Sequence, residues 1–68
     1  MTREQIAEAI REMDCLEQKE REALAGLLYE AREKQTQEAI GKAMAVIDWL
    51  YQTERITLIN GLEMRDLI

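Results

Sequence analysis

Apolar residues recur every three or four positions along most of the chain, which is the spacing of an amphipathic helix. Thr2, followed three residues later by Gln5, has the pattern of a capping box and predicts a helix over residues 2–13. Asp14 and Glu17 repeat the pattern, so we expect a break near residue 13. The apolar stripe of this first helix consists of Ile6, Ala9, Ile10 and Met13.

A second stripe follows, and it predicts another amphipathic helix. Gly26 lies inside it and is interpreted as a site of close helix packing rather than a turn. Tyr29 lies at the edge of the stripe and is expected at the boundary between core and solvent. The stripe consists of Leu16, Ala23, Leu24, Leu27, Leu28 and Ala31.

Residues 32–38 are polar on every side, and two interpretations stay open. In one, Thr36 caps a new helix and the polar run contains a loop. In the other, one helix runs unbroken from about residue 15 to about residue 53, a length of roughly 58 Å. The run contains no Gly, Pro, Asn or Asp, the residues that usually form turns, so we favour the unbroken helix.

The third stripe is the widest. One row consists of Ala39, Ala43, Val46 and Leu50, and the next of Ile40, Met44, Ile47 and Tyr51. Trp49 widens the arc further, which indicates neighbours on more than one side. Thr57 then predicts the start of a short last helix over about residues 57–67, although Asn60 and Gly61 could instead form a turn.

These patterns predict an all-α fold for one small domain over residues 1–68, with three to four helices and either a long central helix or a helical hairpin. A chain of this size buries only about 60% of its unfolded surface and usually needs an additional source of stability. Self-association is one such source, so we expect a homodimeric bundle, with a monomeric bundle and an obligate partner of another kind as the alternatives. The expected oligomer or partner interface comprises Leu24, Leu28, Ile40, Ala43, Met44, Ile47, Trp49, Leu50, Tyr51, Leu62 and Leu67.

Composition argues against catalysis and against cofactors. The chain has one Cys, no His and no Ser, which excludes a disulfide scaffold and a Ser-His-Asp triad and disfavours a zinc site. The pairs Glu17/Glu20 and Glu30/Glu33 could hold Mg²⁺, but such spacing is common by chance in a glutamate-rich helix. Cys15 is expected to be a passive thiol. We therefore expect no enzyme, no cofactor and no metal.

Charge and hydropathy bear on location and partners. The longest apolar run, residues 43–47, is far shorter than the ~20 residues that span a bilayer, and no secretory signal is evident. We expect a cytoplasmic protein with no membrane partner. The formal net charge of −5 and the dispersed basic residues disfavour nucleic acid as a partner.

The favoured function is that of a small self-associating protein that acts by protein–protein interaction, as an adaptor, inhibitor or regulator such as a bacterial or mobile-element accessory protein. Docking is expected on an apolar patch containing Trp49 or the C-terminal Leu62, Leu67 and Ile68, with Trp49→Ala and Ile47→Asp disrupting assembly. The alternative is a nucleic-acid-linked regulator, either a helical dimer that binds RNA or DNA or an acidic mimic of nucleic acid.

Overall fold

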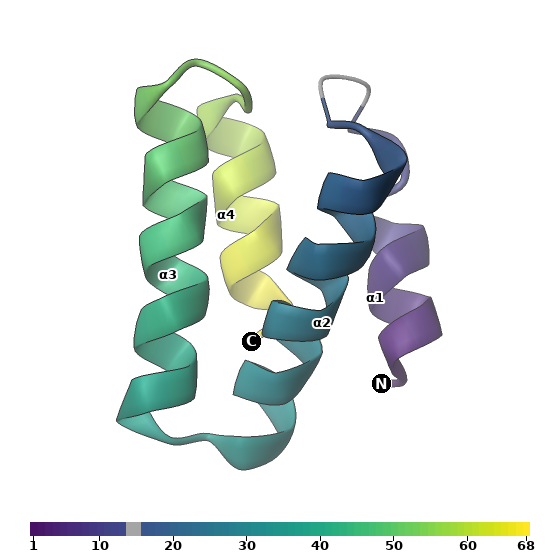
Figure 1. Cartoon of the computed structure of the whole chain (residues 1–68), viewed down its shortest axis with the longest axis vertical. Helices are drawn as coiled ribbons and strands as arrows, with labels where there is room; N and C mark the ends of the chain where they lie inside the picture. Colours follow the sequence, from purple (N-terminus) through teal and green to yellow (C-terminus); the bar gives the residue numbers. More distant parts are fainter. Residues whose placement is uncertain (14–15) are drawn as a thin grey trace.

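The computed structural model describes residues 1–13 and 16–68, which form an all-α fold without strands (Figure 1). Each helix runs roughly opposite to the one before it (Figure 1). The predicted fold class is therefore confirmed at the level of an all-helical chain. The helices are α1 (Arg3–Ala9), α2 (Gln18–Lys34), α3 (Gln37–Gln52) and α4 (Leu58–Asp66).

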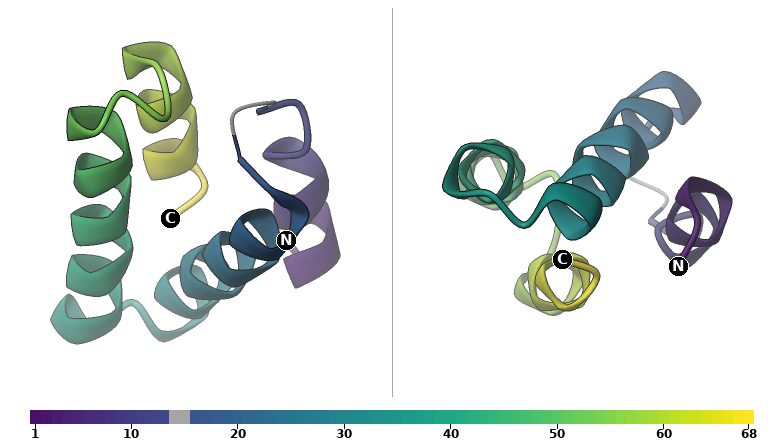
Figure 2. Two further views of the ribbon diagram at one scale, coloured as in Figure 1. Left: turned by 45° about the horizontal axis from the view of Figure 1, so that its top comes forward. Right: turned by 90° about the horizontal axis from the view of Figure 1, so that it is seen from below.

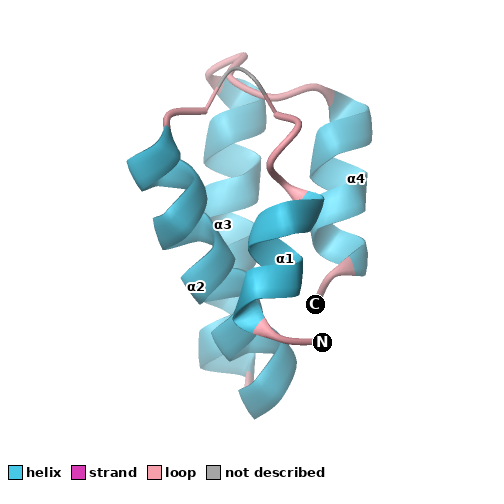
Figure 3. Ribbon diagram, turned by 90° about the vertical axis from the view of Figure 1, so that its right-hand side faces the viewer, coloured by secondary structure: helices cyan, strands magenta, loops and turns pink. Residues whose placement is uncertain are grey.

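Helix α2 is central: α1 packs on one side of it and α3 on the other (Figure 2). Helix α4 packs against α3, so that α3 and α4 lie behind α1 and α2 in the side view (Figure 3). The whole arrangement measures 28 × 23 × 19 Å. It leaves α3 and α4 as a neighbouring pair at one side of the molecule.

Threonines begin three of the four described helices, as their positions in the sequence suggest. The Thr2 hydroxyl accepts a hydrogen bond from the Gln5 backbone N–H at 3.2 Å, and the Gln5 side chain accepts one from the Thr2 N–H at 2.8 Å. Thr57 caps α4 by accepting from the Asn60 N–H at 3.1 Å. Asn60 and Gly61 are consequently helical and form no turn. Helix α1 ends at Ala9, earlier than the predicted residue 13.

The favoured unbroken helix over residues 15–53 is wrong, because the chain reverses at Gln35. This residue adopts a left-handed conformation with φ 52° and ψ 30°, and Thr36 then caps α3 by accepting from the Ala39 N–H at 3.1 Å. A left-handed non-glycine residue costs about 1–2 kcal/mol. Folding back places the apolar stripe of α2 against that of α3, and the surface buried in this way outweighs that cost. The helical hairpin is the correct interpretation.

The Gln35 side chain fastens this reversal to the end of the chain. Its Nε2 donates to the Arg32 carbonyl at 2.9 Å and to the Ile68 carbonyl at 3.1 Å. The Arg32 Nη1 donates to the Leu67 carbonyl at 3.2 Å. Leu67 and Ile68 also pack against the core, so the segment after α4 is held beside the α2–α3 turn.

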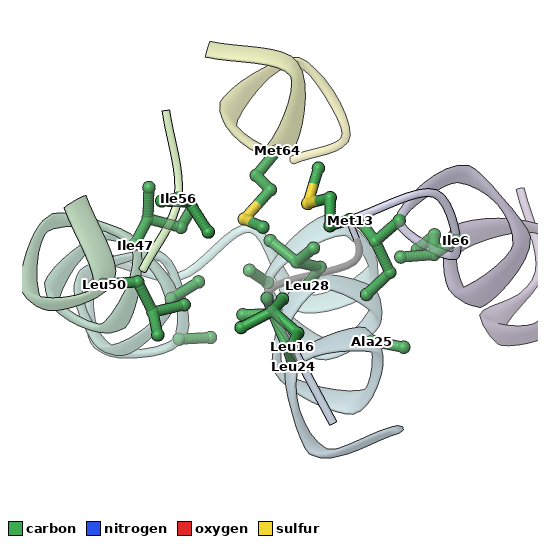
Figure 4. Close-up of a cluster of buried hydrophobic side chains, with 14 residues drawn as sticks. Ile6, Met13, Leu16, Leu24, Ala25, Leu28, Ile47, Leu50, Ile56 and Met64 are labelled. Carbon is green, nitrogen blue, oxygen red and sulfur yellow. The ribbon is translucent and has the colours of Figure 1, made fainter. Parts of the chain in front are cut away.

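A single chain closes its own hydrophobic core. Side chains from all four helices and from the connections between them meet around Leu28, with Met13 and Met64 over it (Figure 4). No polar or charged side chain is buried among the described residues. The buried set is Ile6, Ile10, Met13, Leu16, Leu24, Ala25, Leu28, Ala31, Ala39, Ala43, Ile47, Leu50, Ile56 and Met64.

Two expectations at the start of α2 fall partly outside the described residues. Those for Asp14 as a cap and for Cys15 as a passive thiol concern residues that the structure does not describe. Glu17 occupies the N-cap of α2, and its backbone N–H donates to the Glu20 carboxylate at 3.1 Å. Across the described ranges, no helix combines the length and the apolar character needed to cross a membrane.

Candidate protein-docking surface

Large apolar side chains that face solvent gather in one part of the chain. Apart from Met1, the described large apolar residues that are exposed all lie between residues 49 and 62. Their exposed fractions are unusual for hydrocarbon and aromatic side chains, because burying one such side chain is worth about 1.5–3 kcal/mol. They are Trp49 at 55%, Tyr51 at 47%, Leu58 at 58%, Ile59 at 67% and Leu62 at 49%.

The two exposed aromatic residues of the predicted interface, Trp49 and Tyr51, lie on different flanks of α3. Trp49 and Tyr51 are two residues apart, which places them about 200° apart around the helix. Tyr51 lies on the flank next to α4, where it lines a groove with Leu58 and Leu62. Trp49 shares the other flank with Lys42, seven residues earlier, which lines a hollow between α2 and α3.

The groove between α3 and α4 has a mostly apolar lining. It encloses about 180 Å³, and all of its lining residues belong to these two helices. Gly61 is buried at its floor, and a Cβ added there would lie 3.7 Å from Ile47 Cγ2, which is an ordinary van der Waals contact. The lining consists of Ile47, Asp48, Tyr51, Leu58, Gly61, Leu62 and Arg65.

One ion pair lies across this groove. Arg65 Nη2 donates to Asp48 Oδ1 at 2.5 Å and so joins α4 to α3. Both side chains stay roughly half exposed, at 42% for Arg65 and 52% for Asp48. The groove therefore presents one positive and one negative group beside its apolar side chains.

Other ion pairs hold the edges of the fold. Arg55 donates to the Glu20 carboxylate and joins the α3–α4 connection to the start of α2. This hydrogen bond, followed by the one from the Glu17 N–H, lowers the pKa of Glu20 below 4.5. The hydrogen bond from Lys34 likewise lowers the pKa of Glu30, and the same contact raises the pKa of Lys34.

Polar surface elsewhere offers little chemistry. The hollow between α1 and α2, about 390 Å³, is lined by both signs of charge, including Glu8, Arg11, Arg21 and Glu22. Within residues 1–13 and 16–68, no three Cys, Asp or Glu side chains are grouped as a metal site. The α3–α4 groove and the Trp49 flank are therefore the candidate docking surfaces.

The structure divides the eleven predicted interface residues into three groups. Leu24, Leu28, Ala43, Ile47 and Leu50 are buried in the core of the single chain, where no partner can reach them. Partly buried are Ile40, Met44 and Leu67. Exposed are Trp49, Tyr51 and Leu62.

Sequence reasoning missed four residues of the surface: Asp48, Leu58, Ile59 and Arg65. A signal for Leu58 was present. Thr57 fixes the start of α4, and Leu58 then shares a row with Leu62, four residues later. The Asp48–Arg65 pair depends on how α4 lies on α3, which the pattern of a single helix does not specify.

Comparison with known proteins adds no family to this description. No protein-family model, curated protein or solved structure matches the chain. What the chain does is therefore inferred from its own surface.

Proposed function

We propose that this chain is a small non-catalytic helical protein that acts by protein–protein interaction and associates with itself through its C-terminal half. One observation carries the proposal: the exposed large apolar side chains within residues 49–62. Of these side chains, Tyr51, Leu58 and Leu62 line one groove, and contiguous exposed apolar surface marks interaction sites because its contact with water is unfavourable. Such a surface serves an adaptor, an inhibitor or a regulator.

The chemistry of this surface favours a protein over a small molecule. Pockets for small ligands usually enclose about 300–1,000 Å³ and surround most of the ligand. The α3–α4 groove encloses only about 180 Å³. Leucine, isoleucine and tyrosine side chains along two neighbouring helices instead match the apolar side chains that a partner helix presents every three or four residues.

Charge argues in the same direction. Among the described residues, five of the nine basic side chains are paired with carboxylates, and one of these pairs, Arg65 with Asp48, lies in the groove itself. A surface for nucleic acid needs basic groups available to phosphates. The nucleic-acid alternative stays a prediction that no feature of the described surface favours.

Sedimentation equilibrium of the purified chain over a wide concentration range tests the proposal. We expect the molar mass to rise above 7.9 kDa with concentration, and the double variant Leu58→Glu/Leu62→Glu to remain at the monomer mass. Gln18→Glu, which adds a carboxylate to the first turn of α2, is the matched control and should associate as the wild type does. A wild-type chain that stays monomeric at every concentration would overturn self-association.

A further inference from the structure

We propose that a second copy of this chain occupies the α3–α4 groove, packed about a two-fold axis so that α3 and α4 of both copies form a four-helix bundle. The inference rests on the proposed function and adds the surface, the occupant and the symmetry. Asp48 and Arg65 of one copy then lie against Arg65 and Asp48 of the other. The shape of the groove, its charges and one glycine support this arrangement.

Helical side chains of suitable size line both walls of the groove. Leu58 and Leu62 lie one turn apart on α4, and Tyr51 faces them from α3. All three are roughly half exposed. Such a row inserts between the side chains of an opposing helix, as in the packing of helix bundles. The same three side chains on a second copy would supply the opposing helical row against which this row can pack.

The charges of the groove favour a second copy over a partner of one sign. A two-fold interface brings the same patch of both copies together, so each charged group needs its opposite within that patch. The groove carries one carboxylate and one guanidinium, Asp48 and Arg65, already 2.5 Å apart. Within the groove lining, each copy can therefore offer the other one group of each sign, although the formal net charge of each chain is −5.

Gly41 is consistent with a close approach of a second backbone to α3. It is exposed in the interior of α3, and a Cβ added there would meet no described atom within 4 Å. Glycine at such a position costs about 1 kcal/mol relative to alanine, and no described neighbour in the single chain requires it. Gly41 precedes Asp48 by seven residues, two helical turns, and so lies on the same side of α3.

Two charge-reversed variants, mixed, test the two-fold arrangement. Asp48→Lys alone places its new ammonium group against Arg65 of the second copy, and Arg65→Glu alone places its new carboxylate against Asp48 of the second copy. Each variant by itself should dimerise at least about tenfold more weakly than the wild type. An equimolar mixture of the two should recover dimer to within about threefold, because each copy then supplies the charge that the other needs.

The recovery distinguishes contact between chains from contact within one. Both single variants break the pair inside their own chain, and mixing cannot repair that. The doubly reversed Asp48→Lys/Arg65→Glu chain restores both kinds of contact, so it should fold and dimerise close to the wild type. If a single variant unfolds, the doubly reversed chain still tests the groove. Adding Leu62→Glu to the doubly reversed chain should abolish its dimer. Circular dichroism checks each fold.

The possible results separate this inference from the function on which it rests. A wild-type dimer that none of these substitutions weakens would overturn the groove as the interface and leave self-association standing. Weakening without recovery in the mixture would overturn the two-fold exchange of charges. Trp49→Ala is the matched control. The sequence predicts that it disrupts assembly, but Trp49 lies outside the groove, on the opposite flank of α3, so we expect it to change the dissociation constant less than about threefold.

Discussion

The N-terminal and C-terminal halves of this small domain differ in how many large apolar side chains they leave exposed to solvent. In α1, α2 and the connection between them, the described isoleucines and methionines are buried, and the leucines are buried or partly buried. In α3, α4 and their connection, the core positions are filled in the same way, but five large apolar side chains remain exposed. One chain is enough to close the first half. The second half leaves these five side chains exposed in the single chain.

The difference follows from the width of the apolar arc on each helix. Helix α2 carries a narrow stripe, and α1 and α3 cover it. Helix α3 is apolar over a wider arc, so that after packing on α2 and α4 it still exposes Tyr51 on one flank and Trp49 on the other. The predicted neighbours on more than one side of this helix are α2 and α4 of the same chain.

The largest difference in stability is expected between a substitution at a core position and the same substitution at an exposed position. Ile47→Asp places a charge at a site that is 1% exposed, which should cost about 4 kcal/mol or more and abolish helicity. Ile59→Asp, at an exposed site on α4, should leave the fold intact. Circular dichroism with urea titration compares them. The sequence predicts that Ile47→Asp disrupts assembly, and because Ile47 is buried in the single chain we expect this substitution to act through loss of the fold.

A smaller effect is expected at Gly41, where one substitution should change the stability of the single chain and its dimerisation in opposite directions. Gly41→Ala should stabilise α3 by up to about 1 kcal/mol, because alanine is the better helix former and the added Cβ meets no described atom of the chain. The same substitution should weaken dimerisation. Urea unfolding at a concentration where the chain is monomeric measures the first, and sedimentation measures the second. A gain in both quantities would exclude a close helix contact at Gly41.

The pair that joins the two halves should make stability depend on pH. Because Arg55 and the Glu17 N–H lower the pKa of Glu20, its contribution is fully present above the unfolded-state value near 4.5 and is lost as the pH falls through the folded value. Glu20→Gln should therefore lose less stability than the wild type over that acidic range. Urea midpoints measured at stepwise lower pH test this, with Glu63→Gln as the control. Equal losses in Glu20→Gln and the wild type would contradict a role for this pair.

The smallest change in stability and association is expected from a substitution in the N-terminal half, whose large apolar side chains after Met1 are covered or partly covered within the chain. Glu8 and Arg11 pair at 3.3 Å with both side chains more than 70% exposed, and such pairs contribute little. Glu8→Gln should change the free energy of unfolding by less than about 0.5 kcal/mol and leave the dimer unchanged. Chemical denaturation and sedimentation check both. A clear loss of association would place an interface on α1 and contradict the comparison.

Much of the fold could be predicted from the sequence because helix starts are local. Thr2 and Thr57 each cap the helix that their spacing indicates, and the apolar stripes identify most of the core. The same rule offers Thr36 as the start of α3, but the sequence favours the unbroken helix because the reversal uses Gln35, a residue without turn preference. Its stabilisation comes from the packing of α2 on α3, which is a property of the whole chain.

The docking surface was only partly predictable for the same reason. Apolar periodicity identified Leu62 and Tyr51 as candidates, but it did not distinguish them from Leu28 or Ile47, which the single chain buries. It also joined Trp49 to Tyr51, although two residues along a helix point to opposite flanks. Burial and the pairing of Asp48 with Arg65 depend on how the helices are packed.

The most direct test of the difference between the halves is to follow backbone amide NMR shifts while the chain is diluted. We predict that the shifts which change with concentration belong to residues near the groove, from Gly41 to Arg65, and that those of Arg3–Ala9 and the first half of α2 stay constant. Shifts that change mainly in α1 and α2, or none that change at concentrations where the mass exceeds 7.9 kDa, would contradict the account.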